Sequence, residues 1–403
     1  MGTRLPIQEM KYRHEQNKDK PYIDWRLPEN RKEGFLLWLD WRMKYNDLDH
    51  YMVANTYRDS VGNKSPTKLS MTEEQTLWYC LLYGCTYQTE MAWVLYYNFP
   101  DFWNVDIEEM QKWNVANLEK QLYAKDTKYN KGRIADQVKS MQEIIGPYGS
   151  IKKWIENQLV DDENQSFVNM YNETSRLHKF GRMTSWLFTQ ALFETANIPV
   201  RPDTMLCTDP SSWSVRSGLC YLYNRDDIIE AKTKTTLSKD DMAFVATKEK
   251  DLFSEAYDYI SKENKPIFSN FLLESQLCQY KKLMLGGDYA GHSSGDHYSR
   301  GCKLRERWKG EVNFDAFFED AIMKHHELVR GKRENKPLRY LCQKTGQMIN
   351  MHKDYDYMPN MYLEIGIDPE WLFDETNNNL IENKIDIYKN NAYEKIGIES
   401  FMV

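Results

Sequence analysis

The sequence predicts a mainly α-helical protein with few or no strands. Apolar residues recur at the i, i+3, i+4 spacing of a helix face in successive segments of the chain. Strand-like segments do not alternate with these helices, and no internal repeat is visible. The 403 residues are enough for two or three units of ordinary domain size or for one large helical body.

We divide the chain at soft boundaries near residues 160 and 310. The expected units are residues 1–69, an N-terminal arm and first helix; residues 70–160, a helical subdomain; residues 161–310, a helical subdomain with a glycine-rich basic loop; and residues 311–403, a C-terminal helix and acidic tail.

The first predicted helix follows a polar arm. Residues 1–32 are charged and contain Pro6, Pro21 and Pro28, so we expect an extended segment. Residues 33–47 then place apolar side chains near helical spacing. These candidate core residues are Phe35, Leu36, Trp38, Leu39 and Met43.

Capping and breaking residues delimit the next helices. Ser70 and Glu73 form an S-x-x-E capping box, which predicts a helix over residues 71–83 that ends at Gly84. Residues 84–100 predict a turn and a second, largely buried helix.

Four further helices are expected before residue 180. Asp106 is a helix-capping residue for the segment that follows it. Gly146 and Pro147 separate predicted helices over residues 134–145 and 149–159. A third amphipathic segment covers residues 163–179.

Residues 180–196 predict a strongly amphipathic helix. Its apolar face contains Met183, Trp186, Leu187, Gln190 and Ala191. Arg182 lies in the first turn, where outward-pointing backbone N–H groups favour an anion. Arg182 is therefore a candidate phosphate contact, and an ordinary exposed charge is the alternative.

Residues 214–219, SVRSGL, predict a polar turn that could bind an oxyanion, although the same letters fit a helix start. Residues 238–262 are rich in Lys, Asp and Glu and predict a solvent-facing helix. After residue 310, an amphipathic helix ends at Gly331, and residues 354–403 are acidic.

Residues 271–308 contain many charged and titratable side chains that could take part in catalysis or binding. They open as a helix, break into a glycine-rich loop and resume in a basic run, so backbone N–H groups and cations could approach an anion. The charged and titratable side chains are Glu274, Lys281, Lys282, His292, Asp296, His297, Arg300, Lys303, Arg305 and Arg307. A flexible surface loop with solvated charges is the alternative.

The charge distribution suits an enzyme that acts on nucleic acid and then releases it. The formal net charge is −7, but residues 281–309 hold seven Lys/Arg against three Asp/Glu. The aromatic share of 14% allows base stacking, although most Tyr and Trp residues fit a helical core.

Several common chemistries are absent from the sequence. It contains no P-loop, no G-x-G-x-x-G after a strand and no G-x-S-x-G elbow. His292, His297 and Cys302 match no closed zinc site, so we expect no metal and no cofactor. The seven cysteines include no C-x-x-C pair, and we expect reduced thiols.

No membrane association is expected. The N-terminus lacks the apolar stretch of a signal peptide, and no run of 18 apolar residues occurs.

Three stretches together resemble a phage enzyme family. They are FGRMTSWLFTQAL (180–192), SVRSGLC (214–220) and ESQLCQYKK (274–282). The chain resembles the amino-acid:DNA transferases of thymine hypermodification, the alpha-glutamyl/putrescinyl thymine pyrophosphorylases, and the helical domain of 5-hydroxymethyluracil DNA kinases. Residues 83–102 are similar to a helix-turn-helix entry segment of these families, which is distantly like helix-hairpin-helix DNA glycosylases. The resemblance covers roughly residues 70–310.

The resemblance implies a reaction. An amine from an amino acid or polyamine displaces pyrophosphate from pyrophosphorylated hydroxymethyluracil in double-stranded phage DNA, in the host cytoplasm. This chemistry needs cations for the leaving group, a carboxylate that accepts the ammonium proton, and a pocket that aligns the reactants. The chain lacks the kinases' P-loop domain, which favours a stand-alone transferase.

The candidate residues for this reaction lie in these three stretches and in the remainder of residues 271–308. Glu274 is the candidate base, and Lys281 lies two helical turns after it, on the same helix face. His292, Asp296 and His297 are candidates for orienting the amine or protonating the leaving group. The predicted phosphate and DNA contacts are Arg182, Arg216, Lys281, Arg300, Lys303 and Arg305.

Two alternatives remain open. The first is a glycosylase-like enzyme, although its G-x-G-type hairpin has only Gly146-Pro147-Tyr148-Gly149 as a counterpart. The second is a DNA-binding helical module without catalytic activity.

Overall fold

The computed structural model is mainly α-helical, which confirms the predicted fold class. It describes residues 28–44, 57–58, 64–65, 71–230, 237–262, 264–284, 292–314, 337–341 and 348–352. The α-helices are α2 (Arg31–Lys44), α4 (Glu73–Thr86), α5 (Thr89–Asn98), α6 (Ile107–Ala116), α7 (Ile134–Ile145), α8 (Ile151–Glu156), α9 (Glu163–Thr174), α10 (Arg182–Glu194), α11 (Trp213–Leu222), α12 (Asp226–Glu230), α13 (Lys239–Tyr259), α14 (Asn270–Met284) and α15 (His292–Arg307).

Short elements complete the described chain. The 3-10 turns are η1 (Phe102–Asn104), η2 (Leu118–Lys120), η3 (Lys125–Asn130), η4 (Gly146–Tyr148) and η5 (Lys265–Ile267). Two antiparallel pairs of strands join β1 (Tyr57–Arg58) to β2 (Lys64–Ser65) and β3 (Pro337–Leu341) to β4 (Met348–His352).

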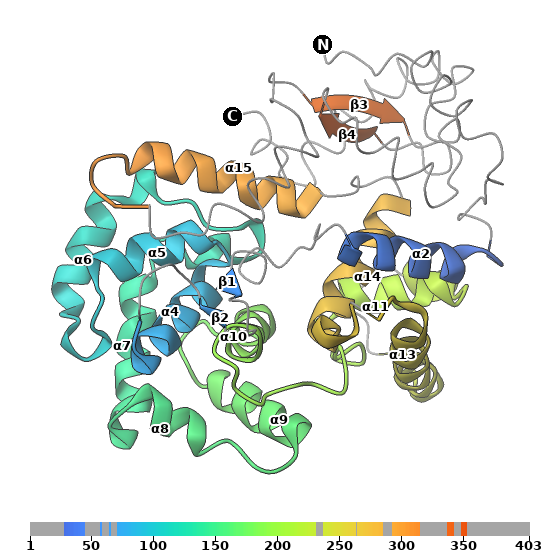
Figure 1. Cartoon of the computed structure of the whole chain (residues 1–403), viewed down its shortest axis with the longest axis horizontal. Helices are drawn as coiled ribbons and strands as arrows, with labels where there is room; N and C mark the ends of the chain where they lie inside the picture. Colours follow the sequence, from blue (N-terminus) through green and yellow to red (C-terminus); the bar gives the residue numbers. More distant parts are fainter. Residues whose placement is uncertain are drawn as a thin grey trace.

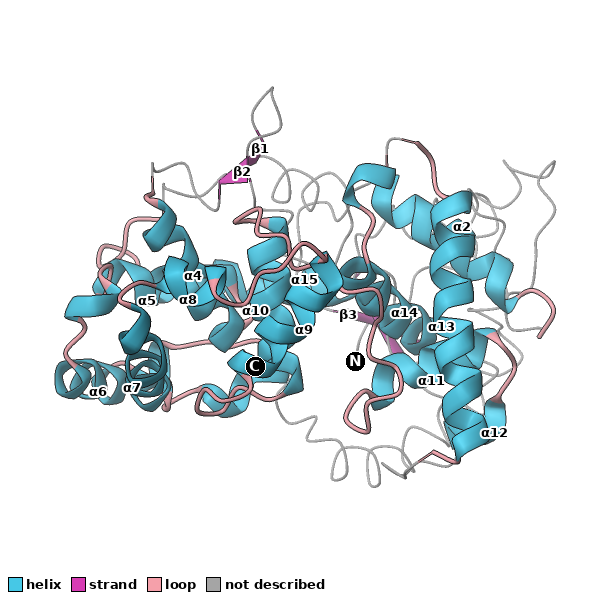
Figure 2. Ribbon diagram, turned by 90° about the horizontal axis from the view of Figure 1, so that it is seen from below, coloured by secondary structure: helices cyan, strands magenta, loops and turns pink. Residues whose placement is uncertain are grey.

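The helices form two neighbouring groups (Figures 1 and 2). One contains α4 to α10 with α15 lying along α5, and the other contains α2 and α11 to α14. No described helix has the combination of length and apolar character that crossing a membrane requires.

Helix α4 is the centre of the first group. All of its residues from Leu77 to Thr86 are buried, and it packs against α5 and α10. At Gly84 an added Cβ would lie 3.0 Å from Cβ of Phe188, so glycine allows α10 to come close. The structure therefore corrects the predicted helix end: α4 runs through Gly84 to Thr86, and its C-cap residue Tyr87 has a left-handed φ of 49°.

The cap of α4 is also corrected. The capping box is made by Thr72 and Gln75, two residues after the predicted Ser70 and Glu73. The predicted cap of α6 is confirmed, because Asp106 Oδ1 accepts hydrogen bonds from the N–H groups of Glu108 and Glu109.

The second group packs around α14. Tyr280 lies in the aromatic cluster with Phe35 and Trp38 of α2, at centroid distances of 5.2 and 5.4 Å. Gly218 of α11 faces the backbone of α14, since an added Cβ would lie 2.8 Å from the carbonyl oxygen of Leu277. This close approach sets the position of α11 against α14. All five core residues predicted in the first helix are buried.

Two predicted irregular segments are helical. The predicted polar turn over residues 214–219 lies within α11. The predicted glycine-rich loop is shorter than expected, because residues 292–307 form α15. The predicted N-terminal arm through residue 27, the helix that ends at Gly331 and the acidic tail lie outside the described residues.

Candidate active site

Helices α10, α11 and α14 carry the three stretches on which the sequence resemblance depends, and α14 contacts both of the others. Glu274, near the start of α14, pairs with Arg182 of α10. Lys281, two turns later on α14, reaches Ser214 and Ser217 of α11. The structure therefore brings together candidate residues that are far apart in the sequence.

The Arg182–Glu274 pair is nearly enclosed. Nη2 of Arg182 lies 3.0 Å from Oε1 of Glu274, and both side chains are 11% exposed. Burial alone would lower the pKa of Arg182, but the Glu274 carboxylate raises it, and the net shift is upward. Oε2 of Glu274 accepts no hydrogen bond from the residues that the structure describes.

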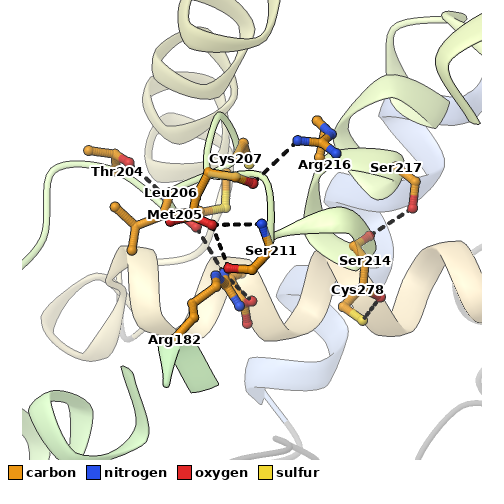
Figure 3. Close-up of polar contacts among 12 residues, drawn as sticks. Arg182, Thr204, Met205, Leu206, Cys207, Ser211, Ser214, Arg216, Ser217 and Cys278 are labelled. Atoms are coloured by element: carbon orange, nitrogen blue, oxygen red, sulfur yellow. Dashed lines mark hydrogen bonds and ion pairs between the residues drawn. The ribbon is translucent and has the colours of Figure 1, made fainter. Parts of the chain in front are cut away.

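Arg182 also fixes the connector between α10 and α11. Its Nη2 donates to the carbonyl oxygen of Met205 at 3.3 Å (Figure 3). From the other side, Oε1 of Glu249 accepts hydrogen bonds from the backbone N–H groups of Met205 and Cys207. Leu206, between them, has a φ of 58°, which allows both N–H groups to face one carboxylate.

Glu249 was missed by the sequence analysis, which placed residues 238–262 in solvent. Glu249 is 4% exposed. Burial raises its pKa, the hydrogen bonds from the backbone N–H groups of Cys207 and Met205 lower it, and the net shift of the pKa is upward. The signal was the spacing of Val245, Leu252 and Ala256, which bury one face of α13 around Glu249.

Lys281 is held by hydroxyl and carbonyl oxygens of α11. Its Nζ donates to Oγ of Ser217 at 2.9 Å, and to O and Oγ of Ser214 at 3.3 Å each. Oγ of Ser214 also lies 2.7 Å from Sγ of Cys278 on α14 (Figure 3). The lysine ammonium is thus fixed about 10 Å along α14 from Glu274, given the helical rise per residue.

Arg216 lies deeper than the other candidates. Its side chain is 1% exposed, and Nη1 donates to the carbonyl oxygen of Asp209 at 3.3 Å. The guanidinium carbon lies 5.8 Å from the ring centroid of Trp213.

The remaining candidates lie on α15, whose inner face packs on α5. His297 is buried against the ring of Tyr87, with centroids 4.6 Å apart, and its carbonyl oxygen accepts from Nε2 of Gln88. Arg305 lies 3.7 Å from the buried carboxylate of Glu90. These contacts do not link His297 or Arg305 to the Arg182–Glu274 pair.

Arg300 and Lys303 lie on another side of α15. With Arg307 they follow i, i+3, i+7 spacing, which forms one stripe along a helix. Arg300 is half-buried, Lys303 is exposed, and Arg307 donates to the carbonyl oxygen of Glu119. His292 is the first residue of α15.

No group of three or more metal-binding side chains was found among the residues that the structure describes. The six described cysteines are free thiols, and four of them are buried. Burial raises the pKa of Cys220 to about 12, which makes it a poor nucleophile.

Known proteins share these site segments. The family model described as amino acid:DNA transferase matches residues 60–289, more than half of the chain. A serinyltransferase of Salmonella phage ViI is 25% identical over 228 residues, which cover 54% of this chain and 53% of the relative. This chain thus spans about half the length of the curated relative it matches, and no solved structure matches it.

The matched range of the family model includes α10 and α11 and all of α14, and therefore Arg182, Arg216, Glu274 and Lys281, whereas α15 lies beyond it. The resemblance noted in the sequence is confirmed by this match. The chain belongs to the amino acid:DNA transferase family.

Proposed function

We propose that the protein transfers the amine of an amino acid or polyamine onto 5-pyrophosphoryloxymethyluracil in double-stranded phage DNA, with release of pyrophosphate. The observation that supports this best is the arrangement along α14. A carboxylate and an ammonium lie two turns apart, and each is fixed by another of the three family segments. Because the proposed substrate is phage DNA, the enzyme would act in the cytoplasm of the infected host.

The proposed reaction is a displacement at the methylene carbon of the modified base. Glu274 accepts a proton from the incoming ammonium, since only the free amine can attack. The new C–N bond forms as the C–O bond to pyrophosphate breaks, and the pyrophosphate leaves with the electron pair. Amine and leaving group lie on opposite sides of the carbon, which suits two catalytic groups separated along one helix.

Lys281 is the proposed contact for the leaving pyrophosphate. Charge increases on that group as the C–O bond breaks, so a fixed cation stabilises the transition state more than the ground state. Oxygen atoms of Ser214 and Ser217 accept hydrogen bonds from the Lys281 ammonium and hold it in place. Arg182 fixes the Glu274 carboxylate and adds a second positive charge at the same site.

We assign DNA-backbone contacts to the stripe of Arg300, Lys303 and Arg307 on α15. Cations that follow one side of a helix suit the phosphates of a duplex. Arg305 and His297 pack towards α5, so we give both of them a structural role in holding α15. The role of His292 stays a prediction from the sequence.

A product assay tests the proposed function. DNA that carries 5-pyrophosphoryloxymethyluracil is incubated with the protein and a panel of amino acids and polyamines, digested to nucleosides and examined by mass spectrometry. L-Serine is the first amine to test, since the curated relative is a serinyltransferase. A new nucleoside with stoichiometric pyrophosphate is expected. Abasic sites formed without an amine would instead support base removal, and no product with any amine would refute the proposal.

A further inference from the structure

The buried cation Arg216, beside the site, has no acidic partner among the residues that the structure describes. Arg216 is 1% exposed, and no carboxylate lies within ion-pair distance of it among the described residues. Within the described part of the chain, its Nε has no hydrogen-bond partner. Burying an uncompensated charge is costly, so such a guanidinium is expected to receive an anion during function.

A second orphan group lies at the same end of α11. Ser212 is the residue before the first turn of this helix and is 1% exposed. No described residue forms a hydrogen bond with its Oγ. The Arg216 guanidinium reaches back to this end, because it contacts the Asp209 carbonyl and the Trp213 ring. The N-terminal N–H groups of α11 add a positive dipole there.

We propose that Arg216 and Ser212 bind the α-carboxylate of the amino-acid substrate. This inference depends on the proposed function and identifies the class of amine as an amino acid rather than a polyamine. A planar guanidinium and a hydroxyl match a carboxylate's two oxygens. The depth of Arg216 argues for a small substrate that enters the protein, because a DNA phosphate on a duplex stays at the protein surface.

The location of the carboxylate contact is consistent with the proposed chemistry. The start of α11 lies against α14, because Ser214 in the first turn of α11 accepts a hydrogen bond from Lys281 and lies 2.7 Å from Sγ of Cys278. An amino acid with its carboxylate at the start of α11 would therefore have its amine near the groups of α14. A polyamine has no carboxylate, so it would leave Arg216 and Ser212 unsatisfied and would bind less well.

Equilibrium binding to the full chain tests this proposal without DNA. The probes are two pairs that differ by one carboxylate, glycine with methylamine and L-serine with ethanolamine, together with inorganic pyrophosphate. The variants are Ser212→Ala, Arg216→Lys and Arg216→Gln. Ser212→Ala removes a hydroxyl that has no partner, so we expect it to fold normally, and thermal unfolding verifies this for each variant.

We expect the wild-type protein to bind at least one amino acid at least about tenfold more tightly than its amine partner. Ser212→Ala and Arg216→Gln should reduce that preference about tenfold or more and leave pyrophosphate affinity unchanged. Arg176→Gln, at an exposed position in the turn that follows α9, is the matched control and should retain the preference.

Equal binding of amino acid and amine by the wild type would overturn the proposal, and so would an unchanged preference in folded Ser212→Ala and Arg216→Gln. Loss of pyrophosphate affinity instead would assign Arg216 to the leaving group. None of these outcomes depends on transfer to DNA, so this inference and the proposed function can fail separately.

Discussion

At the scale of single residues, the Arg182–Glu274 pair combines a structural and a chemical role. Removal of either partner leaves a nearly enclosed charge, which is much more costly than loss of an exposed pair. We expect Arg182→Gln and Glu274→Gln each to lower the free energy of unfolding by about 2–3 kcal/mol, and the double variant to lose less than their sum. Urea denaturation measures all three.

The matched control is Asp251→Asn, which breaks the half-exposed Lys248–Asp251 pair of α13. Its expected cost is about 0.5 kcal/mol or less. If the double variant lost the sum of the unfolding free energies lost by the two single variants, Arg182 and Glu274 would not stabilise the fold as a coupled pair.

Glu249 gives a prediction for pH dependence. Burial raises its folded pKa above the ordinary 4.5, so the folded state holds this proton more tightly than the unfolded state does. The free energy of unfolding should therefore fall as pH rises through the raised pKa. In Glu249→Gln, the amide oxygen can still accept hydrogen bonds from the backbone N–H groups of Met205 and Cys207, but the buried negative charge is removed. This variant should therefore be at least as stable as the wild type at pH 7.

Unfolding of both proteins at pH 4, pH 5.5 and pH 7 tests this. The stability advantage of Glu249→Gln should shrink as pH falls towards the ordinary pKa. A variant that loses stability at pH 7 and keeps the wild-type pH dependence would show that the charged carboxylate is required.

The sequence allows the positions of single residues on their helices to be predicted better than their contact partners. Glu274 and Lys281 share a helix, so their two-turn spacing follows from periodicity. Nothing in the sequence links Arg182 to Glu274, which lie 92 residues apart. Such pairs depend on how α10 and α14 pack, and a single chain gives no local signal for that.

At the scale of elements, the contact of α11 with α14 depends on Gly218. A methyl group there would lie 2.8 Å from the Leu277 carbonyl oxygen, so the two helices must move apart. We expect Gly218→Ala to lower the free energy of unfolding by about 1–2 kcal/mol, after the higher helix propensity of alanine is included. It should also lower the transfer rate, because Lys281 would shift relative to Ser217.

Gly146→Ala is the control for this change. Gly146 has no atom within 4 Å of an added Cβ, so alanine meets no neighbouring helix there and should cost less than at Gly218. Its cost should be small but not zero, because the following Pro147 disfavours the helical angles of Gly146 for a residue with a Cβ. Thermal unfolding and the transfer assay compare the two variants. Equal stability and activity in both would show that the close approach at Gly218 has no mechanical consequence.

Helix boundaries were predictable where local signals were strong. The sequence predicts a helix over residues 134–145, and α7 is Ile134–Ile145, because its apolar spacing is regular and Gly146-Pro147 follows.

The sequence does not predict helix α15, because Gly295 and Gly301 are typical of a loop. Gly301 is instead needed for packing, since any Cβ would collide with the buried Glu90 carboxylate.

At the scale of the whole molecule, DNA binding and chemistry are assigned to different helices. Lys303→Gln on α15 should weaken DNA binding similarly for all sequences and reduce the slope of log affinity against log salt by about one. Fluorescence anisotropy over a salt series measures both. Lys139→Gln, an exposed lysine on α7, is the control and should leave the slope unchanged. A slope that is the same in both variants would remove α15 from the DNA interface.

The most direct test of the site on α14 is the single-turnover transfer rate on pyrophosphorylated DNA. The account predicts that folded Glu274→Gln and Lys281→Gln each lose about 100-fold or more in rate, whereas Lys139→Gln transfers like wild type. DNA affinity should stay within about twofold in both site variants, because the stripe on α15 is intact. A folded Glu274→Gln protein that transfers the amine at the wild-type rate would contradict the account.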